Sequence, residues 1–235
     1  MMGMALFLAC AGEVQTVTLS GTVTDAPEAA GAPVAGATVT VYDETLATFG
    51  ETTSGDDGAF ALDIPALATF YVQVRGEGRV PTAFSGTAGL GDLYAGEGYP
   101  WVADADFVAG ERAAHADCAS ADAAGAVVVG VARVYLPSTA LGELPIASTA
   151  DIAVLGSDAQ RYLACYLDDA GASSSDATLT GATGRFAVFG VPEGPAIVGV
   201  SWVDPSGERT THEFQFLVPA EGVVPLYPAL VGDLP

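Results

Sequence analysis

The sequence contains no lysine, and its seven basic residues are all arginine. Chemistry that needs a lysine amine, such as a Schiff-base nucleophile, a phosphate-binding loop or a Lys–Asn isopeptide cross-link, is therefore excluded. Because 29 residues are acidic, the net charge is −22. A surface of this sign repels phosphate backbones, which argues against nucleic-acid binding. The acidity leaves two interpretations, a solvating surface or divalent-cation binding.

Histidine is also scarce. The two histidines, His115 and His212, lie in different segments, so a His-x-His metal motif is missing, and both are expected at the surface. The nucleophile motif Gly-x-Ser-x-Gly and the metal motif His-Glu-x-x-His are absent as well. We predict a non-enzymatic chain without catalytic residues, cofactor or bound metal.

Three cysteines are present, and the first follows an apolar run. Leu8-Ala9-Cys10 resembles a bacterial lipobox, in which the cysteine is lipidated and becomes the mature N-terminus. On this interpretation residues 1–10 are a signal-peptide-like leader and 11–16 a tether. The protein is then exported and lipid-anchored at the outer membrane, periplasm or cell surface. The alternative is an apolar leader without lipidation; no other run approaches the ~20 apolar residues of a membrane span.

The remaining pair, Cys118 and Cys165, lies in the second half of the chain. An even number of cysteines in an exported protein favours one disulfide, and two buried thiols are the alternative.

Short apolar runs alternate with Gly- and Pro-containing turns along the whole chain, which is typical of β-sandwiches. A helix-compatible stretch at 101–116 interrupts them, with Trp101, Ala105 and Val108 predicted to pack inward. The predicted strands are 17–24, 34–42, 48–53, 59–64, 70–74, 127–135, 150–155, 161–167, 186–191, 196–202, 213–218 and 223–227. Residues 76–100 are interpreted as an edge strand and a connecting loop.

Two stretches repeat one motif, a polar turn that runs into Gly-x-Phe. They are Thr53 to Phe60 and Thr180 to Phe186. With Ser20-Gly-Thr-Val23, Pro33-Val-Ala-Gly-Ala-Thr-Val39 and Pro192-Glu-Gly194, the first half and part of the second resemble the carboxypeptidase regulatory-like domain family.

That resemblance implies two tandem transthyretin-like, Ig-like β-sandwiches. The expected parts are a first sandwich at 17–100, a short helical connector at 101–122 and a second sandwich at 123–235. It also implies a non-catalytic structural or interaction module with a protein or glycan partner. The membrane is contacted through the lipid alone, and the oligomeric state is left open.

Two alternative functions have candidate residues. A carbohydrate-binding module would use Tyr94, Tyr99 and Trp101 as a stacking platform. A calcium-dependent adhesin would use spaced carboxylates, of which Asp104 and Asp106 have a suitable local spacing. The other carboxylate pairs are Asp43/Glu44, Asp56/Asp57 and Asp168/Asp169, and Asp56-Asp57-Gly58 is expected to be turn chemistry.

Overall fold

The computed structural model describes residues 14–27, 31–95, 100–118, 120–134, 144–168, 172, 174, 177–204 and 206–231. The strands of the first half are β1 Thr16–Thr22, β2 Thr38–Tyr42, β3 Thr48–Thr53, β4 Ala59–Pro65, β5 Thr69–Arg75, β6 Thr82–Thr87 and β7 Leu93–Tyr94. The helix α1 Ala105–Ala114 follows. The second half contains β8 Ala126–Val134, β9 Asp151–Leu155, β10 Arg161–Leu163, β11 Cys165–Tyr166, β12 Arg185–Val191, β13 Gly194–Val203, β14 Arg209–Val218 and β15 Val223–Val231. The predicted all-β class is confirmed.

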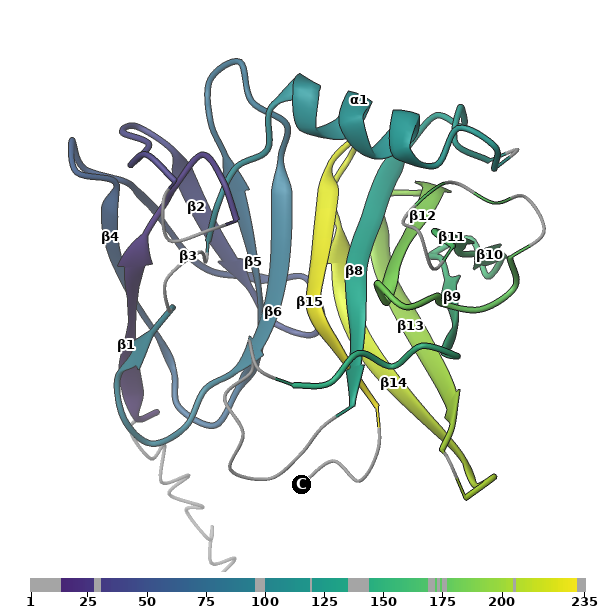
Figure 1. The fold of residues 1–235 in the computed structure, drawn as a ribbon. Coiled ribbons are helices and arrows are strands. Elements are labelled where there is room, and N and C mark those ends of the chain that lie inside the picture. The colour runs from purple at the N-terminus through teal and green to yellow at the C-terminus, as the bar shows by residue number, and fades with distance from the viewer. Residues whose placement is uncertain are drawn as a thin grey trace, which may run out of the picture.

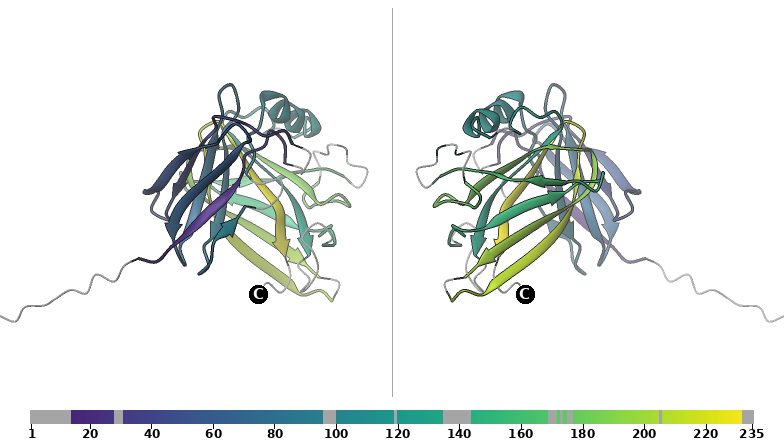
Figure 2. Two further views of the ribbon diagram at one scale, coloured as in Figure 1. Left: turned by 90° about the vertical axis from the view of Figure 1, so that its left-hand side faces the viewer. Right: turned by 90° about the vertical axis from the view of Figure 1, so that its right-hand side faces the viewer.

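The two halves have the same strand pairing. In the first half β1 pairs with β4 antiparallel and with β7 parallel, and in the second half β8 pairs in the same two ways with β12 and β15. The facing sheets have the orders β3-β2-β5-β6 and β10-β9-β13-β14. Each half is therefore a β-sandwich, and the two sandwiches have the same topology (Figures 1 and 2).

One sheet nevertheless runs through both sandwiches. Its order is β11-β12-β8-β15-β6-β5-β2-β3, so the C-terminal strand β15 lies between the two halves. Val223 pairs with Thr82 of β6 in parallel, and its N–H donates to the carbonyl oxygen of Pro81 at 2.8 Å. The halves share a sheet, and the boundaries expected at 100 and 123 stay predictions.

The predicted strand at 161–167 is split in two. β10 pairs with β9, whereas β11 pairs with β12 in the facing sheet. The chain therefore changes sheets at Ala164, and the hydroxyl of Tyr166 accepts a 2.7 Å hydrogen bond from the N–H of Ile152 across the sandwich. The apolar run that the sequence predicts as one strand therefore contributes a short strand to each of the two sheets.

The first Gly-x-Phe turn is held by a serine hydroxyl and a glycine. The Ser54 hydroxyl accepts from the N–H of Ala37 at 2.9 Å and donates to the carbonyl of Val34 at 2.7 Å. Gly58 has a φ of 75°, and its N–H donates to the carbonyl of Gly55 at 2.9 Å. The turn thus closes the first sandwich at the start of β4.

The second turn repeats these contacts with other residues. The Thr180 hydroxyl accepts from the N–H of Ala150 at 2.9 Å and donates to the carbonyl of Ala147 at 2.6 Å. Gly184 has a φ of 65° and donates to the carbonyl of Gly181 at 3.0 Å. The second copy keeps the contact although it lacks the Pro-x-x-Gly-Ala sequence, because the bonds go to the backbone.

Replacing either turn glycine by alanine should destabilise the protein. A Cβ at Gly58 would lie 2.6 Å from the carbonyl oxygen of Val23, and one at Gly184 would lie 2.8 Å from that of Ala132. Both positions also need positive φ, so we expect a loss of about 2–3 kcal/mol in the free energy of unfolding for each substitution. Urea unfolding measures it. Gly89→Ala, where a Cβ meets nothing within 4 Å, is the control, and equal stability of all three variants would contradict this account.

Candidate functional site

The outer face of β8 and β12 is apolar in the second sandwich. By strand register, Val127 and Val129 occupy the positions that Thr18 and Ser20 occupy in β1. Likewise Phe189, opposite Val127, corresponds to the exposed Asp63, opposite Thr18. The first copy presents polar side chains on this face, so the second copy needs something to cover its own.

The connector provides that cover. Phe107 and Val108 of α1 pack against the cluster that contains Val127, Val129 and Phe189. In Figure 1, α1 crosses the ends of β15 and β8. The predicted helix is present, but Ala105 is exposed, so its predicted inward position is wrong.

Trp101 joins this cover to the first sandwich. Its backbone forms a parallel bridge with Thr24, and its carbonyl oxygen accepts a hydrogen bond from the Thr82 hydroxyl on β6. The indole ring packs edge-to-face on Phe107 with ring centroids 5.0 Å apart. Trp101 is 1% exposed. Its predicted role in ligand contact is therefore wrong, because its ring is part of the core.

The other two residues of the predicted stacking platform are not brought together with it. Tyr94 is 67% exposed and lies at the rim of an apolar cavity of about 250 Å³ between β6 and β7. Tyr99 lies outside the described residues.

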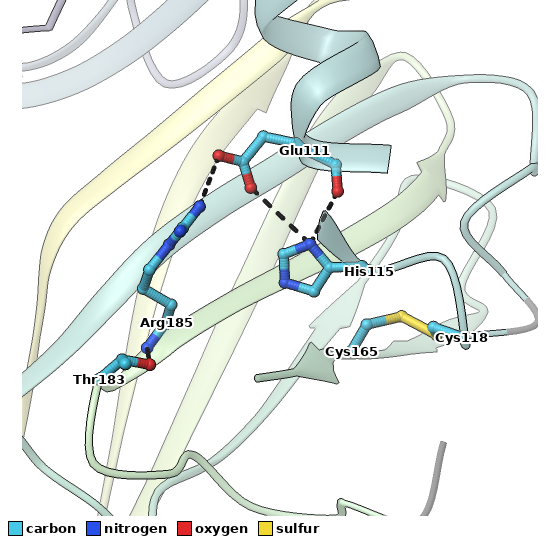
Figure 3. A network of polar contacts seen from close by, with 6 residues as sticks. All are labelled: Glu111, His115, Cys118, Cys165, Thr183 and Arg185. Atoms are coloured by element: carbon cyan, nitrogen blue, oxygen red, sulfur yellow. Dashed lines mark hydrogen bonds and ion pairs between the residues drawn. A yellow bond between two sulfur atoms is a disulfide. The ribbon is translucent and has the colours of Figure 1, made fainter. Parts of the chain in front are cut away.

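A polar network lies beneath the helix, with Glu111 and His115 buried and Arg185 40% exposed (Figure 3). A carboxylate oxygen of Glu111 accepts from the guanidinium of Arg185 at 2.9 Å, and the Glu111 side chain is 10% exposed. His115 Nδ1 donates to the backbone carbonyl of Glu111 at 2.8 Å. Since Arg185 belongs to β12, this network ties the helix to the sheet.

A disulfide ties the end of the connector to the same sheet. Cys118 and Cys165 are bonded across 47 residues of sequence, and Cys165 is part of β11. In the chain-entropy model a loop of this length stabilises the fold by about 4 kcal/mol. Arg112 adds hydrogen bonds to the carbonyl oxygens of Ala121 and Ala123, and its guanidinium lies 5.6 Å from the centre of the Phe189 ring.

Sequence reasoning missed this network and placed His115 at the surface, which is wrong because His115 is fully buried. The proximity of Glu111 and His115 could have been predicted, because the two residues are four apart on the predicted helix and so share one face. Arg185 lies far along the chain, and the fold alone brings it to Glu111.

The pair Glu111–His115 looks like a base with its orienting carboxylate, but its burial argues against catalysis. No hydrogen-bond partner of Nε2 is found among the described residues. A general base must reach a substrate proton within hydrogen-bond distance, and the cover of α1 closes the ring off. The contacts of this site are structural, because they hold the connector against β11 and β12.

The carboxylates considered for calcium binding make turn and cap hydrogen bonds. Asp104 is the N-cap of α1 and accepts from the N–H of Phe107 at 2.7 Å. Asp57 accepts from Ala59 at 3.0 Å, as expected for turn chemistry. No group of three potential metal-binding side chains is found in the part of the chain that the structure describes.

Residues 18–92 match the family model of the carboxypeptidase regulatory-like domain. The match covers most of the first sandwich. The resemblance stated from the sequence is confirmed for this part of the chain, and the match ends before the connector. A comparison with curated protein sequences finds no match.

The solved structures to which this chain is similar include a Bacillus anthracis protein and two pilins. The Bacillus anthracis TIE protein is 9% identical with a TM-score of 0.30, and the alignment covers 92% of this chain and 33% of that one. The shaft pilin SpaA from Lactobacillus rhamnosus GG is 12% identical with a TM-score of 0.26, covering 94% and 99%. GBS52, the minor pilin of Streptococcus agalactiae, is 9% identical with a TM-score of 0.29, covering 93% and 98%. The chain thus spans about a third of the length of the TIE protein.

Burial of His115 should make the stability of the protein depend on pH. Burial lowers the pKa of His115 below its ordinary value of 6.5, although the Glu111 carbonyl and carboxylate oppose the shift; Arg185 adds to it. Between the lowered folded pKa and 6.5 the unfolded chain binds more protons, so stability falls as pH decreases through this window. One proton gives a slope of at most about 1.4 kcal/mol per pH unit.

Urea unfolding at intervals from pH 7.5 to 5 measures this slope in the wild type and in His115→Gln. We expect the slope to be smaller in His115→Gln than in the wild type. Equal slopes in the two proteins would contradict the assignment.

Proposed function

We propose that this protein is a non-catalytic structural and interaction module of a bacterial cell envelope, exported and lipid-anchored at Cys10. The observation that carries the proposal is the way the two sandwiches are locked together. They share one sheet through β15, and the connector is held by a disulfide and by the Glu111–Arg185 ion pair. Such a unit suits a passive role, in which a rigid body holds a surface at a distance from the membrane.

Two observations support this role. The family model that residues 18–92 match is that of a regulatory-like domain. The disulfide favours an oxidising compartment and hence export. Among the described residues no helix has the length and apolar character needed to cross a membrane. Cys10 and its leader lie outside the described residues, so the lipid anchor rests on the sequence.

The residues that the two alternative functions would need are buried or engaged in other contacts. A sugar-stacking platform would need the ring of Trp101, which is buried. A calcium-dependent adhesin would need carboxylates with free lone pairs facing one another, whereas Asp104 caps a helix and Asp57 closes a turn. Neither is proposed here.

Lipidation of Cys10 is tested by expressing the full chain in a Gram-negative host that is fed a fatty acid with an alkyne tag. We expect the wild type to acquire the tag and Cys10→Ala to lose it. Because Phe7 stands where the lipobox usually has leucine, Phe7→Leu should increase labelling. Absence of the tag from both wild type and Phe7→Leu would overturn the anchor while leaving the structural role untouched.

A further inference from the structure

One long sheet edge has no strand partner. β14 is the last strand of the sheet β10-β9-β13-β14, and within the described residues nothing pairs with its outer edge. Its final residues, 216–218, are buried, whereas 209–215 alternate between exposed and half-buried positions. An open edge of this kind is a template for another extended chain.

The same edge is occupied in the first sandwich. β6 holds the place there that β14 holds in the second: Thr82 pairs with Val74 of β5 as His212 pairs with Val200 of β13. β15 pairs with β6 in parallel through one residue pair, Val223 opposite Thr82. The fold itself therefore shows that a strand can pair at this edge.

A groove lies on the outer face of the second sandwich, where residues of β9, β13 and β14 line it. It consists of two hollows of about 400 and 320 Å³, which share Leu155 and Ile197 in their lining. Gly199 and Ala153 line the larger hollow, so small and aliphatic side chains leave room for those of a bound strand.

The polar rim of the groove is mainly acidic. Glu44 lines the smaller hollow, and Asp151 and Glu213 line the larger. Among the residues that line the two hollows, Arg161 is the one cation. Its guanidinium lies 3.9 Å from the Asp151 carboxylate. With a net charge of −22 on the whole chain, the groove attracts cations and repels anions.

We propose that the β14 edge and this groove bind an extended, lysine- or arginine-bearing segment of a partner protein. The partner adds a strand beside residues 209–215, and its alternate side chains lie on the outer face, where basic groups meet Glu213 of β14. Asp151 and Glu44 lie farther across this face and add to its negative potential. Backbone hydrogen bonds supply affinity in this mode of recognition, and the side-chain positions supply specificity. A second copy of this chain is a poor occupant, because both molecules carry the same large negative charge. The inference does not depend on the lipid anchor at Cys10.

The test uses the full chain and a fluorescent decapeptide of alternating lysine and threonine, with anisotropy measured in 0.15 M salt. We expect Glu213→Lys to weaken binding about tenfold and the control Glu77→Lys, an exposed carboxylate away from the groove, to change it less than about twofold. A peptide methylated at alternate backbone nitrogens keeps its charge, but it lacks the N–H donors along one of its two edges and so cannot pair with β14 through that edge. Methylation in one of the two registers should weaken binding about tenfold or more.

Hydrogen exchange locates the contact. Added peptide should slow the exchange of amides within 209–215. Equal effects of Glu213→Lys and Glu77→Lys, or full binding by both methylated peptides, would show attraction to overall charge and overturn the proposal. Protection of 209–215 by a neutral oligosaccharide instead of the peptide, or by self-association without it, would also overturn it.

Discussion

The structure depends on the need to cover the apolar outer face of β8 and β12. Val127, Val129 and Phe189 lie at positions where the first sandwich has Thr18, Ser20 and Asp63, and such side chains are stable only out of water. The connector meets this need by laying α1 across the sheet.

Covering that face joins the two halves energetically. One continuous cluster of buried side chains runs from the interior of the first sandwich through Trp101 and Val102 to Val129 on β8. β15 reinforces the link, because it pairs with both β8 and β6. The disulfide and the Glu111–Arg185 pair then hold the cover in place, so the described part of the connector is fixed to the second sandwich.

Much of the fold could be predicted from the sequence, because it follows local rules. The alternating strands and the repeated Gly-x-Phe turn indicated the sandwiches, and the turn contacts at Ser54 and Thr180 are equivalent. The shared sheet could not be predicted, because one bridge between Val223 and Thr82 has no local signature. The burial of Trp101 and His115 was missed for a similar reason: it depends on which distant face the connector meets. The predicted pairing of Cys118 with Cys165 is what the structure contains.

The two sandwiches are expected to unfold as one cooperative unit. Differential scanning calorimetry of the full chain with its disulfide intact tests this most directly. A shared core and sheet predict a single transition, with a calorimetric enthalpy of unfolding equal to the van't Hoff enthalpy. Two separate transitions, or a calorimetric enthalpy about twice the van't Hoff value, would show that the sandwiches unfold independently and would contradict the account.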